Sequence, residues 1–332
     1  MFLSYFVNPN TPAALKSTLY FGCDKNQTES AWFWYQTPWF FRYNRRIKSL
    51  YVGGRSGKDT SQNKEEYSME DKITLPAAGK QLSYEGYTLQ WEDDFNAPQL
   101  NRGDWNVELH QPGWVNHELQ AYIDSPETIF IENSTLVLKP VEIKQSDGTI
   151  SYVSGRVNTQ HKHDFQYGIF EARIKVPAGK GFLPAFWMMP TEEDHYGQWP
   201  RCGEIDIMEV LGHDTAKTYG TIHYGNPHRQ SQGSFALTSG DFAKEYHNYA
   251  VRWEPGQISW YLDGQLFFSE SQWYSVTEGR GQVPYPAPFD QPFYIILNLA
   301  VGGDWPGSPD ETTDMSKAAL WVDWVKVYQK EE

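Results

Sequence analysis

Short stretches of alternating apolar and polar residues recur along the chain from Leu82 onward, and turn residues separate them. Clear examples are 133–138, 167–176 and 257–264, and the last of these ends in the hairpin signal Asp263-Gly264. Helical periodicity is scarce. Many short strands at regular spacing predict an all-β fold, a two-sheet β-sandwich or jelly roll.

One of the predicted strands holds three carboxylates in six residues, Glu204-Ile205-Asp206-Ile207-Met208-Glu209. Carboxylates are rarely buried unless they are paired, and like charges this close shift each other's pKa. In a regular strand Glu204 and Asp206 share a face, and Glu209 points to the opposite face. A β-bulge at Ile207-Met208 would bring Glu209 back to the face of the other two.

Three carboxylates on one face have a possible chemical use. Two carboxyls roughly 5–5.5 Å apart are the pair that a retaining glycosidase needs, one as nucleophile and one as general acid/base. A middle Asp206, hydrogen-bonded to the nucleophile, could orient it and tune its pKa. The six residues alone leave two alternatives open: an exposed edge strand with solvated acids, and a calcium site.

The strand and its lead-in, 199–209, closely resemble the active-site signature of glycoside hydrolase family 16, in its laminarinase-like (endo-β-1,3-glucanase) branch. Further segments resemble the family in the family's order, and together they span roughly residues 80–330. The resemblance implies a jelly roll of two curved antiparallel sheets with a concave substrate cleft. The further segments are 91–96, 113–122, 155–159, 167–173, 184–188, 296–307 and 322–328.

The resemblance also implies a role for each carboxylate. Glu204 would be the nucleophile and Glu209 the general acid/base, with Asp206 assisting, in a double displacement that retains the anomeric configuration. The negative charges of Asp206 and Glu204 would raise the pKa of Glu209, which must start protonated. The implied activity is hydrolysis of internal β-1,3 bonds in laminarin-type glucan or in mixed-linkage β-1,3-1,4-glucan, with no cofactor for catalysis.

Two tryptophans and one strand are further candidates for binding the sugar. Trp199 and Trp187 look like the family's stacking platforms, and either Trp187 or its neighbour Phe186 must face the core. Arg156 and Asn158 alternate onto one face of their strand and could donate hydrogen bonds to sugar hydroxyls. A structural salt bridge is the alternative for Arg156.

Loop residues and one histidine complete the substrate-binding candidates. Trp114 and Asn116 lie in the segment that resembles the family's substrate-cleft loop. His223 could hydrogen-bond Asp206 or a sugar, or it could be a satisfied core histidine. Asn298 and Trp305 flank a Gly-Gly turn that resembles a loop at the cleft edge.

A structural calcium ion is a further implication, because members of the family often carry one on the convex face. Asp323 in the last predicted strand matches the usual side-chain ligand, and Asp94 is a second candidate. The remaining ligands would be backbone carbonyls and waters. The sequence shows no zinc-like Cys/His spacing, phosphate-cradling glycine loop or Ser/His/Asp signature.

Net charge and aromatic content limit the classes of molecule that this protein can bind. The net charge of −14 argues against nucleic acid and anionic membranes, whereas a neutral polysaccharide is compatible with it. The 14 Trp and 21 Tyr residues offer flat apolar faces that suit sugar rings, although many must be core. No run of 18 apolar residues predicts a transmembrane helix, and two cysteines make a disulfide framework improbable. We expect a monomer that acts on β-glucan.

Charge divides the chain into two parts. Residues 1–78 hold 10 Lys and Arg against 7 Asp and Glu, while residues 79–332 hold 18 against 35. The first part contains the aromatic cluster 32–41 and a polar, linker-like stretch. It is an accessory module, a partner- or glucan-binding segment, or an upstream region added by a misplaced start codon, and we expect it to pack on the catalytic domain or to be poorly ordered.

The sequence leaves alternatives open for the cellular location of the protein and for its activity class. The substrate predicts an extracellular or cell-surface protein, yet the first residues lack the basic region of a signal peptide. A non-catalytic glucan-binding protein, a transglycosylase and a galactan hydrolase share the fold. Both glutamates are present, which disfavours the binding protein, and the Trp199–Gly203 lead-in and the 113–122 loop favour glucan over sulfated galactan.

Overall fold

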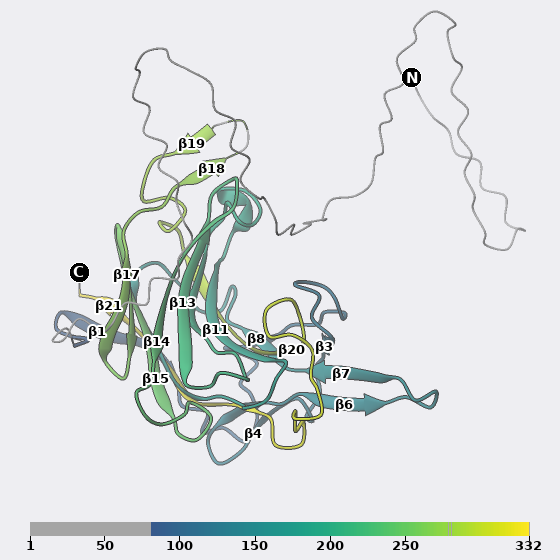
Figure 1. Cartoon of the computed structure of the whole chain (residues 1–332). Helices are drawn as coiled ribbons and strands as arrows, with labels where there is room; N and C mark the ends of the chain where they lie inside the picture. The colour runs from purple at the N-terminus through teal and green to yellow at the C-terminus, as the bar shows by residue number, and fades with distance from the viewer. Residues whose placement is uncertain (1–80, 278, 280, 332) are drawn as a thin grey trace, which may run out of the picture. The chain divides into compact units, whose positions relative to one another are not determined.

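The computed structural model describes residues 81–277, 279 and 281–331 (Figure 1). Within these residues the regular secondary structure is almost entirely β-strand, and the one helix is the short 3₁₀ segment η1 (Glu193–His195). The predicted all-β class is therefore confirmed. The expected N-terminal segment 1–78, with its aromatic cluster, lies outside the described residues.

One large sheet, named here the β21 sheet, has the order β17-β16-β15-β10-β21-β5-β4, with β1 paired to β21. All its strand pairs are antiparallel. Its strands are β1 (Tyr87–Asp93), β4 (Ile129–Ile131), β5 (Leu136–Leu138), β10 (Gly168–Lys175), β15 (His247–Glu254), β16 (Gln257–Leu262), β17 (Gln265–Glu270) and β21 (Leu320–Lys330).

The other large sheet, named here the β12 sheet, has the order β14-β13-β12-β11-β20-β8-β2, with β9 paired to β20. It is also antiparallel throughout. Its strands are β2 (Asn106–Val107), β8 (Arg156–Asn158), β9 (Asp164–Phe165), β11 (Phe182–Pro190), β12 (Glu204–Glu209), β13 (Lys217–Tyr224), β14 (Arg229–Ala236) and β20 (Phe293–Val301).

Two small sheets lie at the edges of the sandwich. In the first, β3 (Gln120–Tyr122) pairs in parallel with β7 (Ile150–Ser154), which pairs antiparallel with β6 (Val141–Lys144). Figure 1 shows the β6–β7 hairpin projecting from the sandwich. The second is the antiparallel pair β18 (Ser275–Thr277) and β19 (Gly281–Val283). No helix in the described residues is long and apolar enough to cross a membrane.

A single apolar core fills the space between the two large sheets. Three fully buried tryptophans, Trp105, Trp253 and Trp260, belong to it. Side chains alternate along each strand, so Phe186 and Met188 on β11 point into the core while Trp187 between them is only partly buried. The prediction that Phe186 faces away from Trp187 is confirmed. Burial of each large apolar side chain contributes roughly 1.5–3 kcal/mol.

The predicted β-bulge in β12 is present. Asp206 pairs with Thr221 on β13 and Glu209 pairs with Tyr219, so two residues of β12 oppose the single residue Gly220. Those two residues, Ile207 and Met208, are both buried in the core. The extra residue returns Glu209 to the face of Asp206, as the sequence pattern predicts.

Gly220 makes room for the group that supports the bulge. A Cβ atom at this position would lie 2.3 Å from Cδ1 of Trp260, so only glycine fits beneath the indole ring. The same indole donates its Nε1–H to the backbone carbonyl of Asp206 at 2.8 Å. The irregular backbone of β12 is thus held by a buried hydrogen bond from the opposite sheet.

Candidate active site

Glu204, Asp206 and Glu209 lie on the face of the β12 sheet that is turned away from the core, named here the open face. The neighbouring β11 confirms the alignment, because Asp206 pairs with Trp187 and Glu209 pairs with Ala185, two residues apart on one side of that strand. Asp206 is 3 % exposed, whereas the two glutamates are partly exposed. The middle acid is therefore shielded, and the outer two remain accessible.

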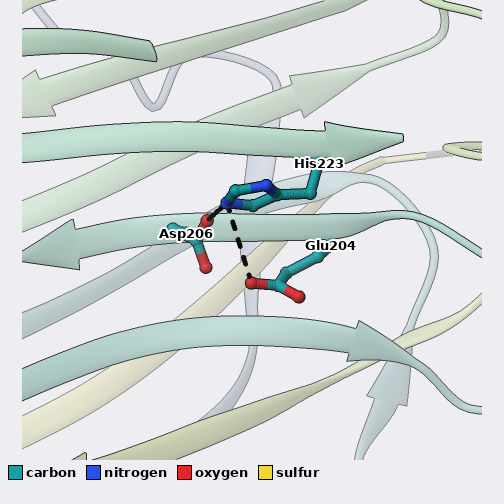
Figure 2. A group of neighbouring side chains, drawn as sticks. All are labelled: Glu204, Asp206 and His223. Carbon is teal, nitrogen blue, oxygen red and sulfur yellow. Dashed lines mark ion pairs between the residues drawn. The ribbon is translucent and has the colours of Figure 1, made fainter. Parts of the chain in front are cut away.

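A histidine of the next strand, His223, lies close to both Asp206 and Glu204 (Figure 2). The Asp206 carboxyl is hydrogen-bonded to that of Glu204, and His223 Nε2 lies 3.3 Å from Asp206 Oδ2 and 4.0 Å from Glu204 Oε1. Burial, and then the negative charge and the hydrogen bond of Glu204, raise the pKa of Asp206 well above its usual value. A protonated Asp206 can donate to Glu204, which leaves the negative charge on Glu204.

The same two causes act on Glu209. Burial and then the charge of Asp206 raise the pKa of Glu209 well above its usual value, and Glu204 adds to the rise. The charge of His223 and a hydrogen bond from Thr221 oppose it only in part. Glu209 therefore holds its proton to a higher pH than an ordinary glutamate does.

Trp199 and His228 complete the surroundings of Glu204. The Trp199 indole donates its Nε1–H to Glu204 Oε2 at 2.6 Å, and 40 % of Trp199 is exposed. His228 Nε2 lies 2.9 Å from His223 Nδ1, and the two rings are stacked. Burial and then the charge of His223 lower the pKa of His228 to about 4, so His228 is neutral near neutral pH.

Crowding three acids on one face has a consequence for stability. Because the folded-state pKa of Asp206 is raised, the folded protein holds a proton that the unfolded chain gives up, and stability is lost as pH rises above the unfolded value of 3.8. We expect Asp206→Asn to stabilise the fold by roughly 0.5–2 kcal/mol at pH 7 and by less at pH 4. Urea unfolding of both proteins at the two pH values checks this, and a gain that is larger at pH 4 would contradict it.

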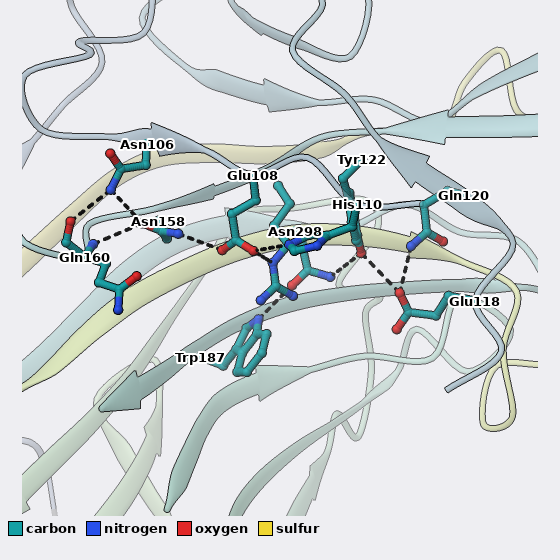
Figure 3. A network of polar contacts seen from close by, with 11 residues as sticks. Asn106, Glu108, His110, Glu118, Gln120, Tyr122, Asn158, Gln160, Trp187 and Asn298 are labelled. Carbon is teal, nitrogen blue, oxygen red and sulfur yellow. Dashed lines mark hydrogen bonds and ion pairs between the residues drawn. The ribbon is translucent and has the colours of Figure 1, made fainter. Parts of the chain in front are cut away.

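Glu204, Asp206 and Glu209 are named here the triad. Across β11 and β20 from the triad, a network of buried polar side chains lies on the open face (Figure 3). Glu108, which directly follows β2, accepts hydrogen bonds from Arg156 Nε at 2.6 Å and from Asn158 Nδ2 at 2.7 Å. Arg156 is 5 % exposed and Asn158 is 6 % exposed. The structure therefore shows the salt-bridge alternative for Arg156, and both predicted sugar donors are held by Glu108.

A second branch of the network fixes Trp187. Its indole donates to Asn298 Oδ1 at 2.7 Å, and Asn298 Nδ2 donates to the Tyr122 hydroxyl at 3.0 Å. The Arg156 guanidinium lies 4.7 Å from the centre of the Trp187 ring. Asn298 thus orients the Trp187 ring on the open face. Asn298 is itself only 5 % exposed, so it is buried beneath that face.

The other loop candidates lie where two loops meet. Trp114 is 49 % exposed, Asn116 is exposed, and the Asn116 carbonyl accepts the backbone N–H of Asp304 at 3.0 Å. Trp305 is 39 % exposed and packs edge-to-face on Tyr219, the partner of Glu209 across the strands. Exposed tryptophans therefore lie on both sides of β12.

The carboxylates of both calcium candidates already contact other protein groups. Arg173 donates to Asp323 Oδ2 at 2.5 Å, so the charge of this carboxylate is already neutralised. Asp94 accepts hydrogen bonds from the backbone and the side chain of Asn96. Neither residue lies in a cluster of three acidic, His or Cys side chains; the one such group in the described residues is Glu204, Asp206 and His223.

Three residues of the open face were not among those predicted from the sequence: Glu108, His110 and His228. Glu108 and His110 continue the alternation that begins at Asn106, with a polar residue at every second position, and this pattern was the available signal. His228 follows β13 in a turn, where alternation says nothing about direction. Its contact with His223 is visible only in the folded chain.

Comparison with known proteins agrees with this geometry. The model of the family "Glycosyl hydrolases family 16" matches residues 116–326. "Glucan endo-1,3-beta-glucosidase A1" of Niallia circulans is 37 % identical, over 74 % of this chain and 38 % of its own length. "Glucan endo-1,3-beta-glucosidase" of Cryptopygus antarcticus is 36 % identical, over 74 % of this chain and 93 % of its own length.

A solved structure shows the same fold. The laminarinase catalytic domain from Thermotoga maritima superposes with a TM-score of 0.63 and 36 % sequence identity, and the match covers 75 % of this chain and all of that one. The chain spans well under two thirds of the Niallia protein but almost the whole of the other two. On the strength of the family match and these similarities, the chain belongs to the glycosyl hydrolases of family 16.

Proposed function

We propose that this protein is a retaining endo-β-glucanase that hydrolyses internal β-1,3-glucosidic bonds of laminarin-type glucan, and β-1,3-1,4-glucan of mixed linkage. The observation that carries the proposal is the bulge in β12, which aligns Glu204, Asp206 and Glu209 on the open face. The relatives named for glucan endo-1,3-β-glucosidase and laminarinase activity support it. The enzyme is a glycoside hydrolase whose chemistry needs only these carboxyls.

The first step transfers the sugar to the protein. A Glu204 carboxylate oxygen attacks the anomeric carbon while Glu209 gives its proton to the departing glycosidic oxygen. The bond between the anomeric carbon and this oxygen breaks, and the leaving chain departs with a new hydroxyl. The raised pKa of Glu209 suits this step, because the acid must still hold a proton when the substrate arrives.

The second step frees the sugar. Glu209, now a carboxylate, takes a proton from a water molecule whose oxygen attacks the anomeric carbon, and Glu204 leaves. Two inversions give net retention. Asp206 and Trp199 each hold one side of the Glu204 carboxyl, so the nucleophile keeps one orientation through both steps.

We expect Trp199→Phe to lower kcat/KM on laminarin by about 10-fold. The substitution keeps a flat ring but removes the N–H that donates to Glu204 Oε2 at 2.6 Å. A hydrogen bond to a charged group is worth about 1.5–3 kcal/mol, and partial exposure of Trp199 lowers this. Steady-state kinetics check the effect. An unchanged kcat/KM would show that the indole N–H does not orient Glu204.

Neutral glucan is the substrate class that suits the open face. The Arg156 guanidinium contacts both Trp114 and Trp187, and Glu108 neutralises it in an ion pair. A sulfated galactan would need unpaired cations to hold its sulfate groups. We also propose that the protein acts on this substrate as a monomer.

The test is release of reducing ends from laminarin, lichenan, agarose and carrageenan, with Glu204→Gln assayed beside the unaltered protein. We expect activity on laminarin and a lower activity on lichenan, none on the galactans, and loss in the variant. Proton NMR of the first-formed product should show the β-anomer. Binding of laminarin without hydrolysis would instead indicate a glucan-binding protein, and longer products would indicate a transglycosylase.

A further inference from the structure

We propose that Glu108 is a positioning residue that fixes the exposed ring of Trp114 as a sugar platform, acting through His110 and Arg156. This inference rests on the proposed function, since it takes a β-glucan as the ligand of the open face. Nothing in the catalytic chemistry uses Glu108, which lies across β11, β20 and β8 from the triad.

One carboxylate oxygen of Glu108 binds both side chains that pack on Trp114, His110 and Arg156. Glu108 Oε2 lies 2.6 Å from Arg156 Nε and 2.7 Å from His110 Nε2. The other oxygen, Oε1, accepts from Asn158 Nδ2 at 2.7 Å. Figure 3 shows Glu108 between Asn158 and His110. Although burial alone would raise the pKa of Glu108, these partners lower it to about 2, so Glu108 is ionised near neutral pH.

Both anchored groups pack on Trp114. The His110 ring is parallel to the indole within 5°, with 3.5 Å between ring centres, and the Arg156 guanidinium lies 5.2 Å from the Trp114 ring centre. With both groups in contact, 49 % of Trp114 remains exposed for a ligand.

Trp114 therefore depends on Glu108 for its order. Most residues of its loop, 111–117, are exposed, and the stack on His110 and Arg156 holds the indole against the sheet. A flat ring that is already immobile loses little freedom when a sugar stacks on it, whereas a mobile ring must be ordered on binding. Removing the charge of Glu108 would release His110 and leave Arg156 as a buried, unpaired cation.

The test is a double-mutant cycle with Glu108→Gln and Trp114→Ala, measured as kcat and KM on β-1,3-gluco-oligosaccharides. We expect Glu108→Gln alone to raise KM by about 3- to 10-fold with kcat changed less than 2-fold. In the Trp114→Ala background it should raise KM less than 2-fold, because its effect passes through Trp114. Equal effects in both backgrounds would overturn the proposal.

A matched control and a second variant guard against general destabilisation. Glu171→Gln removes another buried glutamate, on the β21 sheet, where Glu171 accepts a hydrogen bond from Tyr84, and it should leave KM unchanged. His110→Ala removes the stacking ring but keeps the Glu108–Arg156 ion pair, and it should reproduce the rise in KM. An unchanged KM in folded His110→Ala would overturn the proposed path.

A measurement without substrate separates this inference from the proposed function. The difference in fluorescence anisotropy between chains with Trp114 and with Trp114→Phe isolates the signal of this indole. We expect that signal to lose anisotropy in Glu108→Gln. If it does so while no variant binds or cleaves laminarin, the proposed function fails and the positioning of Trp114 stands. If laminarin is cleaved and the signal is unchanged, the positioning role fails alone.

Discussion

Glu204→Gln should lower kcat on laminarin by roughly 10⁴-fold or more, the scale of losing a covalent nucleophile. The amide of glutamine cannot attack the anomeric carbon, so the covalent glycosyl-enzyme does not form in this variant. The fold should persist, because glutamine has the same shape and its side-chain oxygen can still accept the Trp199 N–H. Reducing-sugar release and thermal unfolding, measured on the same preparation, check both expectations.

The control for this variant is Glu171→Gln, which changes a buried glutamate on the other sheet and should keep full activity. Oligosaccharide binding to Glu204→Gln should remain, since the network around Glu108 and the exposed tryptophans is untouched. Retention of more than about a tenth of the kcat in Glu204→Gln would remove Glu204 from the role of nucleophile.

Glu209→Gln should lower kcat/KM on laminarin by about 10²–10⁴-fold, the usual contribution of general acid–base catalysis. The first step on a nitrophenyl β-glucoside should suffer far less, because that leaving group departs without a proton. Added azide should restore turnover on the activated substrate, since an anion that needs no deprotonation can replace the water. Comparable losses on both substrates would contradict the assignment of Glu209 as the acid.

The pH profile gives a second view of Glu209. The unaltered protein needs this group protonated, so kcat/KM falls as pH rises through its pKa, which burial and the charge of Asp206 hold well above the usual 4.5. The alkaline fall should therefore begin at a higher pH than an exposed glutamate would give. It should be absent in Glu209→Gln, because no proton can leave that side chain.

Much of the open face could be predicted because its signals are local. The bulge follows from the spacing of three acids around Ile207 and Met208, since the core accepts apolar side chains and leaves the carboxyls on the other face. Alternation also predicted that Phe186 and Trp187 face opposite ways, and the structure shows that Phe186 is the one in the core. By contrast, the ion pair of Arg173 with Asp323 across neighbouring strands was not predicted, because strand order brings together residues 150 positions apart.

By itself the sequence determined the sandwich, the family resemblance and the shared face of Glu204, Asp206 and Glu209, because each depends on residues a few positions apart. Only the tertiary structure decided which groups hold that face in place. Glu108 meets Arg156 from 48 positions away, and Trp187 meets Asn298 from 111. Such partners are chosen by strand order and close packing, which alternation along a single strand cannot specify.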